Sequence, residues 1–169
     1  MSDTAPLFEP IKIRGMDVPN RVVMAPMTRS FSPGGVPGQD VADYYARRAA
    51  ADVGLIITEG TTVARGGASG DPRIPNFHED KALAGWQTVA DAVHAAGGKI
   101  APQIWHMGMM RKPGTGPDPD APSDGPSGKT HKGKQVQPEP TESEVADMVM
   151  AYANAAGEAA RLGFDSIEL

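Results

Sequence analysis

Small or polar residues stand at three places where a short apolar run ends, and their types suit contact with a planar heteroaromatic ligand. These residues are Thr28, Gly60 and Gln103. A Thr offers a hydroxyl and a backbone N–H, and a Gly lets the backbone approach a ring closely. A Gln amide combines a donor with an acceptor, which is the pattern needed to read a pyrimidine-like edge. Together they indicate a binding site, provided that the fold brings them close.

Each of these residues also has a simpler interpretation. Thr28 could cap a turn, and Gly60 could be an ordinary turn residue. Gln103 is harder to explain in this way, because it lies inside an apolar run and a buried amide needs several hydrogen-bond partners. The binding hypothesis therefore depends on the elements that position the three residues.

Four short apolar runs predict the strands that would carry these residues. They show no hydrophobic alternation, as expected when both faces of a strand are covered. The predicted strands are residues 21–27, 53–59, 99–105 and 165–169. Polar groups at their carboxyl ends would meet at one edge of a parallel sheet.

Helical stretches separate the predicted strands. Residues 40–51 and 82–96 carry apolar side chains at helical spacing, and the second stretch stops at two glycines. The third helix starts at the capping box formed by residues 141–144, and Gly163 is its expected C′ residue. Its predicted apolar face consists of Val145, Met148, Val149, Tyr152, Ala156 and Ala159.

This alternation predicts an α/β fold with parallel strands, which is either a doubly wound sheet or a TIM (β/α)8 barrel. No strand-to-helix turn carries a Gly-rich phosphate fingerprint, and the segments after the strands are long, which favours the barrel. We therefore expect residues 1–169 to form a single domain with about the first four β/α units of a barrel. Residues 7–15 suggest a hairpin cap, and the Pro/Gly-rich residues 113–140 a long ordered loop near the active face.

Composition excludes several other classes of function. The net charge is −5 and the basic residues are scattered, which argues against nucleic acid. The absence of cysteine excludes disulfides, thiolate nucleophiles and Cys-based metal sites, and the four histidines lack metal-ligand spacing. The chain has neither signal-peptide features nor an apolar run near the roughly 20 residues of a spanning helix. We expect no metal, no nucleic acid, no membrane and a cytoplasmic location, and we interpret His106 as structural.

Several segments are similar, in order and at family spacing, to the Old Yellow Enzyme family of FMN-dependent ene-reductases, which are TIM barrels. The matching segments are LFEP at 7–10, NRVVMAPMTR at 20–29, ITEGT at 57–61, QIWHMG at 103–108 and AARLGFDSIEL at 159–169. The resemblance covers the chain from about residue 7 to residue 169. It corresponds to the N-terminal half of such a barrel.

The resemblance implies which residues line the flavin. Pro26, Met27 and Thr28 match the segment beside the ring, with Thr28 near its carbonyl edge, where a hydrogen bond would stabilise the reduced flavin. Gly60 matches a small residue whose backbone meets the flavin. Gln103 matches the Gln that reads the pyrimidine portion.

Other positions bear on the substrate. Trp105 matches an aromatic residue near the substrate pocket, although a core Trp is the alternative. Met109 stands where many members have Arg, which puts a polar role there in doubt. In the family, a His-x-x-His or His-x-x-Asn pair and then a Tyr would follow Leu169, so we expect no catalytic residue in this chain.

The implied activity is that of a flavoprotein oxidoreductase. It would reduce activated C=C bonds of enals, enones or nitroalkenes with NAD(P)H, by hydride transfer through N5 of FMN. Because unpaired strand edges are a liability, we expect the chain to act only with a complementary C-terminal half-barrel polypeptide or a second copy of itself. The alternative is a non-catalytic half-barrel fragment or assembly module without flavin. A flavin-free lyase or hydrolase is disfavoured, since no strand end carries a nucleophile–base pair or a Lys.

Overall fold

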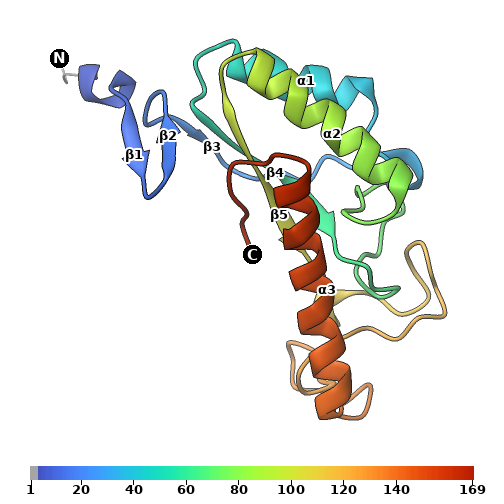
Figure 1. Ribbon diagram of the computed structural model, residues 1–169. Coiled ribbons are helices and arrows are strands. Elements are labelled where there is room, and N and C mark those ends of the chain that lie inside the picture. Colours follow the sequence, from blue (N-terminus) through green and yellow to red (C-terminus); the bar gives the residue numbers. More distant parts are fainter. Residues whose placement is uncertain (1–3) are drawn as a thin grey trace.

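The computed structural model describes residues 4–169 and contains two small sheets, three long helices and three short 3-10 turns (Figure 1). In chain order the elements are η1 (Ala5–Phe8), β1 (Ile11–Ile13), β2 (Met16–Val18), β3 (Val23–Met24), η2 (Pro33–Gly35), α1 (Gln39–Ala49), β4 (Leu55–Thr62), α2 (Asp80–Ala95), β5 (Lys99–Trp105), η3 (Gly108–Met110) and α3 (Glu142–Arg161). No helix within this described range is both long and apolar enough to cross a membrane.

The central sheet has the order β3-β4-β5, and all its neighbours are parallel. β4 and β5 pair from Leu55↔Lys99 to Thr62↔Trp105, with one register shift between Ile57 and Gly60. The parallel strands and their helical crossovers confirm the predicted α/β class. Strands β1 and β2 form the expected antiparallel hairpin, which stands at the amino end of the sheet.

Two of the predicted strands are much shorter in the structure than expected. Only Val23–Met24 of residues 21–27 forms a strand, because Pro26 lacks an N–H and no strand within the described chain lies on the outer side. Residues 165–169 make a single bridge, Gln103↔Glu168, rather than a strand. The second predicted strand was placed too early, since β4 continues to Thr62 by pairing with β5.

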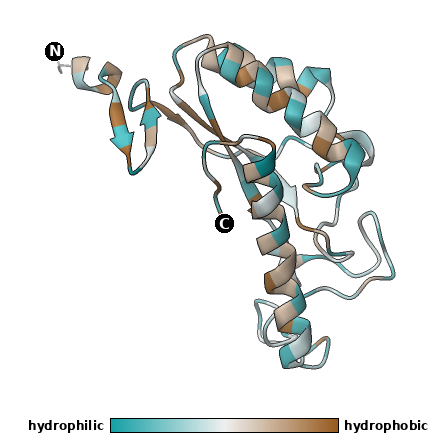
Figure 2. Cartoon of the chain, in the orientation of Figure 1, coloured by the Kyte–Doolittle hydropathy of each residue, from teal (hydrophilic) through white to brown (hydrophobic). Residues whose placement is uncertain are grey.

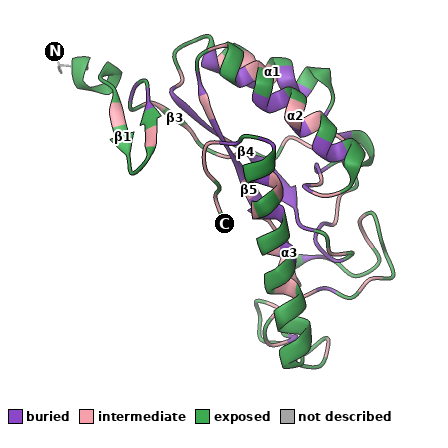
Figure 3. Ribbon diagram, in the orientation of Figure 1, coloured by how far each residue is buried: buried purple, intermediate pink, exposed green. Residues whose placement is uncertain are grey.

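Helices α1 and α2 lie side by side over one face of the sheet, and the core lies between these layers (Figures 1 and 3). The buried apolar side chains of β4 and β5 meet those of α2, so hydrophobic burial fixes the helices against the sheet. Trp86 is fully buried, its ring packs beside Phe77 and Phe164, and its indole N–H donates to the Asn76 carbonyl at 3.0 Å. In Figure 2 apolar and polar residues are interspersed along all three helices.

Helix α3 begins at the predicted capping box. Thr141 Oγ1 accepts from the Glu144 N–H, and the Glu144 carboxylate accepts from the Thr141 N–H at 2.7 Å. Gly163 has φ 78°, which confirms it as the C′ residue. The predicted apolar face was partly wrong: the buried residues of α3 are Ala151, Ala155 and Ala159, whereas Val145 and Val149 are exposed. The first half of α3 extends beyond the sheet and lies beside the loop residues 122–125 and 137–140, which leave Val145 and Val149 exposed (Figure 3).

The long segment over residues 113–140 is tied to the carboxyl ends of β4 and β5. Arg111, which is only 3% exposed, donates to four backbone carbonyls. These carbonyls belong to Ser69, Thr115, Asp118 and Ala121. One buried guanidinium thus folds the first part of the segment against the loop that follows β4.

Candidate functional site

Gly60, Gln103 and Trp105 lie together on one face at the carboxyl end of the sheet. Gly60 and Gln103 are register partners in adjacent strands. A Cβ at Gly60 would lie 3.2 Å from two ring atoms of Trp105 and 3.3 Å from Gln103 Oε1, closer than most side chains tolerate. The absence of a side chain at Gly60 therefore lets the backbone share this face with an aromatic ring and an amide without displacing them.

The Gln103 amide is held in one orientation with its oxygen open. Its Nε2 donates to Glu168 Oε1 at 2.7 Å, and its backbone N–H donates to Thr58 Oγ1 at 3.2 Å. Within residues 4–169 no donor reaches Gln103 Oε1. A half-buried amide oxygen in this state can accept a hydrogen bond from a ligand N–H.

The segment Pro26–Thr28 lies at the same end of the sheet. Met24 pairs with Ile56, so Thr28 and Gly60, each four residues further along, reach a similar level. Pro26 is half-buried, whereas Met27 and Thr28 are exposed. Among the described residues no hydrogen bond joins Thr28 to Gly60 or Gln103, so their proximity depends on contacts made elsewhere in the segments that carry them.

An ion pair behind this face was missed by sequence reasoning. Glu59 is fully buried, and its Oε1 accepts from Arg29 Nε at 3.0 Å and Nη2 at 2.5 Å. The hydroxyl of Tyr45 on α1 lies 3.2 Å from the same oxygen and accepts the Glu59 N–H at 2.8 Å. The signal available in the sequence was a carboxylate within an apolar strand, because such a group requires a cationic or hydrogen-bonding partner.

The surroundings of Tyr45 keep its hydroxyl protonated. Burial, and next the negative charge of Glu59, raise the pKa of Tyr45 well above its usual value. The guanidinium of Arg29 also lies over the ring of Tyr44, 3.7 Å from its centroid. Arg29 is thus fixed by a carboxylate on one strand and by an aromatic side chain on α1.

His106 adjoins Trp105 but faces the loop. Its Nδ1 accepts the Gly108 N–H at 2.8 Å, and its Nε2 lies 3.1 Å from Asp124, which Arg65 also binds with two hydrogen bonds. Burial lowers the pKa of His106, while the hydrogen bond from Arg65 lowers the pKa of Asp124. Both ring nitrogens are engaged within the protein, so neither is free to bind a substrate.

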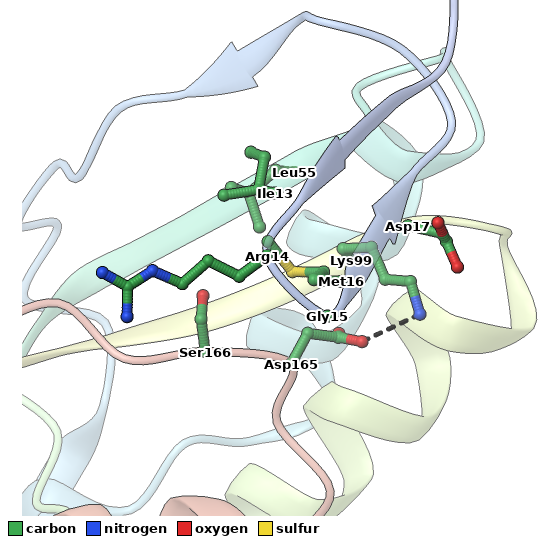
Figure 4. Close-up of a pocket in the computed structure, with 9 residues that line it drawn as sticks. All are labelled: Ile13, Arg14, Gly15, Met16, Asp17, Leu55, Lys99, Asp165 and Ser166. Carbon is green, nitrogen blue, oxygen red and sulfur yellow. Dashed lines mark ion pairs between the residues drawn. The ribbon is translucent and has the colours of Figure 1, made fainter.

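A hollow also lies at the opposite end of the sheet. It measures about 660 Å³ and opens between the β1–β2 hairpin and the first residues of β4 and β5 (Figure 4). Its wall includes Arg14, Leu55 and the pair Lys99–Asp165, whose charged atoms are 2.9 Å apart. Because parallel α/β folds bind ligands at the carboxyl ends of their strands, we place the candidate site at Gly60 and Gln103 instead.

A metal centre has no support in this part of the molecule. Within residues 4–169 no group of three or more His, Asp or Glu side chains could hold a metal ion. The candidate site itself offers hydrogen-bonding groups and an aromatic ring around a small backbone cradle. This is a surface for a flat organic ligand.

Residues 6–169 match the sequence profile of the NADH:flavin oxidoreductase / NADH oxidase family. The chain belongs to this family. It is 37% identical over 181 residues to 12-oxophytodienoate reductase 7 of Oryza sativa subsp. japonica, a match that covers 98% of the chain and 44% of the relative. It is 38% identical to flavin oxidoreductase hxnT of Emericella nidulans, with coverage of 100% and 46%.

Solved structures agree with this assignment. Morphinone reductase in complex with tetrahydroNAD superposes with a TM-score of 0.83 at 36% identity, covering 95% of this chain and 48% of that one. The Old Yellow Enzyme homologue from Zymomonas mobilis gives a TM-score of 0.80 at 34% identity, with coverage of 95% and 47%. These comparisons confirm the Old Yellow Enzyme resemblance and the partial TIM barrel. The chain spans about half the length of the relatives that it matches.

Proteins of this family use FMN, with NAD(P)H as the hydride donor. The residues present here fit such a group. The cradle at Gly60, which a Cβ would fill, admits a ring close to the backbone, and the open oxygen of Gln103 offers an acceptor to a flavin N–H. Predicted roles for Pro26, Met27, Thr28, Gly60 and Gln103 in flavin binding, and for Trp105 in the substrate pocket, remain predictions.

Proposed function

We propose that this chain forms one wall of the FMN site in an NAD(P)H-dependent oxidoreductase that reduces activated C=C bonds. The observation that carries the proposal is the meeting of Gly60, Gln103 and Trp105 at the carboxyl end of the sheet. FMN, when bound, would accept hydride from NAD(P)H and deliver it to the substrate. Family membership and the match to morphinone reductase with tetrahydroNAD support this proposal.

The residues of the chain would orient the cofactor. Gln103 would accept a hydrogen bond from the pyrimidine edge and donate one to it. The hydrogen bond to Glu168 fixes the amide in an orientation that favours this contact. Thr28 would donate to the ring at its carbonyl edge and thereby stabilise negative charge there. Gly60 would let the backbone of β4 approach the ring, and Pro26 and Met27 would cover its side.

Trp105 would line the substrate side of the site. Its ring lies beside the Gly60 cradle and is half-buried, so part of its surface is open to a ligand. Relatives named 12-oxophytodienoate reductase and chanoclavine-I aldehyde reductase favour a small organic substrate. We propose an enal, an enone or a nitroalkene.

The groups that hold the substrate carbonyl and donate the proton would come from outside this chain. We propose that a complementary C-terminal half-barrel polypeptide, or a second copy, supplies them together with the remaining strands. β3 and the segment that follows it carry exposed apolar side chains, Val23 at 49% and Met27 at 55%, which a further strand or loop would cover. A non-catalytic half-barrel without flavin is the competing possibility.

Co-expression tests both possibilities. The chain is produced alone and with the part of morphinone reductase that it does not match, and each product is purified by size exclusion. We expect the pair to elute together, to absorb as a flavoprotein and to bleach with NADPH under anaerobic conditions. A colourless pair, or a chain that stays separate and folded, would instead support the non-catalytic module.

A further inference from the structure

The sequence neighbours of two predicted flavin contacts meet on the far side of the sheet. Gly60 faces Gln103 and Trp105, whereas the adjacent Glu59 faces Tyr45 of α1. Arg29 follows Thr28 directly and binds Glu59. The ion pair therefore links the backbone of the β3 end to the backbone of the β4 end, immediately behind the candidate site.

This link is tight because both of its members are largely removed from water. The side chain of Glu59 is 0% exposed and that of Arg29 14%. Arg29 binds through two side-chain nitrogens, and its backbone N–H also donates to Glu59 Oε2 at 3.4 Å. A buried carboxylate without its cation is strongly unfavourable, so Glu59 restricts where Arg29, and hence Thr28, can lie.

Nothing else in the described chain holds the exposed segment Pro26–Thr28 so firmly. The strand before it is two residues long, and the side chains of Met27 and Thr28 are exposed. To hydrogen-bond the edge of a flavin, the Thr28 hydroxyl must be placed to within a fraction of an ångström. A strand as short as β3 cannot by itself hold the following residues so precisely. The pair behind the sheet supplies the missing constraint.

We propose that Arg29 and Glu59 are positioning residues for the flavin: their ion pair fixes Thr28 relative to the Gly60 cradle. This inference rests on the proposed function. It goes beyond it by assigning part of the cofactor's affinity and reduction potential to two side chains that do not touch the ring. Tyr45 completes the arrangement by holding the Glu59 carboxylate and its N–H.

The decisive variant is Arg29→Lys, because it keeps the positive charge but cannot bind Glu59 through two side-chain nitrogens at once. Glu59→Gln removes the charge of the partner. The matched control is Lys99→Gln, which breaks another ion pair, with Asp165, at the opposite end of the sheet, while Asp165 keeps its contacts with His94 and the Ile100 N–H. All proteins are prepared as the co-expressed pair described above, and stability is recorded by urea unfolding.

Three quantities are measured on each folded protein: the FMN dissociation constant, the midpoint potential, and backbone order parameters at Met27 and Thr28. We expect Arg29→Lys to raise the dissociation constant about tenfold or more and to move the potential to more negative values, because a misplaced Thr28 stabilises reduced flavin less. The order parameters should fall from about 0.85 towards 0.6 or below. Lys99→Gln should lower stability while leaving all three quantities unchanged.

The outcomes separate the two claims. If Arg29→Lys lowers only stability, with affinity, potential and order parameters unchanged in the folded protein, the positioning role is wrong while the proposed function stands. If the unmodified pair takes up no FMN, the proposed function is wrong, and the order parameters alone then decide whether the ion pair orders residues 26–28. Unchanged order parameters in that case overturn the inference as well.

Discussion

The side-chain amide of Gln103 donates to Glu168 at 2.7 Å, and the same two residues form the only bridge between β5 and residues 165–169. One pair of residues thus joins the candidate site to the next segment of the sheet. The carbonyl of Glu168 also accepts the Ile104 N–H at 2.8 Å, and its N–H donates to Pro102 at 3.0 Å. The orientation of the ligand-facing amide is therefore set by the neighbouring segment rather than by β5 alone.

Replacing Glu168 by Leu should weaken flavin binding without unfolding the chain. The backbone bridge remains, but Gln103 Nε2 loses its acceptor, and the amide becomes free to rotate. Loss of one such hydrogen bond costs about 1 kcal/mol, which is roughly a fivefold rise in the FMN dissociation constant. Fluorescence titration of the co-expressed pair measures it. Glu158→Leu, on the surface of α3, is the control, and equal affinities in all three proteins would contradict the assigned role of Glu168.

A side chain at Gly60 should exclude a ring from the cradle. A Cβ there already lies 3.2 Å from Trp105, so Gly60→Val forces the indole or the Gln103 amide to move. Overpacking of this kind costs about 1–3 kcal/mol of stability, and we expect flavin binding to fall at least tenfold. Gly15→Ala is the matched control, because a Cβ at Gly15 meets nothing within 4 Å. Normal flavin uptake by the Val variant would place the ring elsewhere.

Patterns within one segment of sequence predicted local structure well. The helix of residues 82–96 appears as α2 at Asp80–Ala95, and the capping box at Thr141 is formed, since both depend on neighbours a few residues apart. The third strand lies at Lys99–Trp105 as predicted, because it pairs with β4 along its length and buries Ile100, Ala101 and Ile104. The resemblance supplied the barrel and the flavin, which periodicity alone left open.

Features that depend on distant segments could not be predicted in this way. Glu59 and Arg29 are 30 residues apart, and nothing in either local pattern shows that they form an ion pair. The apolar face of α3 was misjudged because the first half of the helix extends past the sheet, so spacing without knowledge of the sheet edge overstates burial. Residues 21–27 and 165–169 have strand-like composition, but the strand requires a paired neighbour that the described chain lacks on that side.

Arg111 should be essential to the order of the segment that follows it. Arg111→Met would remove a guanidinium that donates to four carbonyls, of which the Ser69 carbonyl accepts a buried hydrogen bond and the others partly buried ones. We expect a loss of about 2–3 kcal/mol in the free energy of unfolding, with faster proteolysis within residues 112–125. Lys112→Met, at the exposed neighbouring position, should change neither. Urea unfolding and mass-spectrometric mapping of cleavage sites by a nonspecific protease measure both effects.

The stability of the chain should fall as the pH decreases from 7 to 5. Burial lowers the pKa of His106 below its ordinary value of 6.5, and the nearby carboxylate of Asp124 only partly opposes this. The unfolded chain therefore takes up a proton at His106 before the folded chain does, so acid favours unfolding in this window. His78 is shifted in the same direction by burial and adds to the effect.

The carboxylate of Asp124 contributes only in stronger acid. Its pKa is lowered below 3.8, chiefly by Arg65, so the stability that it provides is present above that value and is lost as the pH falls further. Urea unfolding at pH 7, 5 and 3 therefore distinguishes the histidines, which act between pH 7 and 5, from Asp124, which acts in stronger acid. His106→Asn should reduce the change in the free energy of unfolding between pH 7 and 5, and the Asn side chain keeps an acceptor or donor near Gly108 and Asp124. His78→Asn should remove the contribution of His78 alone, and a slope unaffected by either variant would assign the acid sensitivity to other groups.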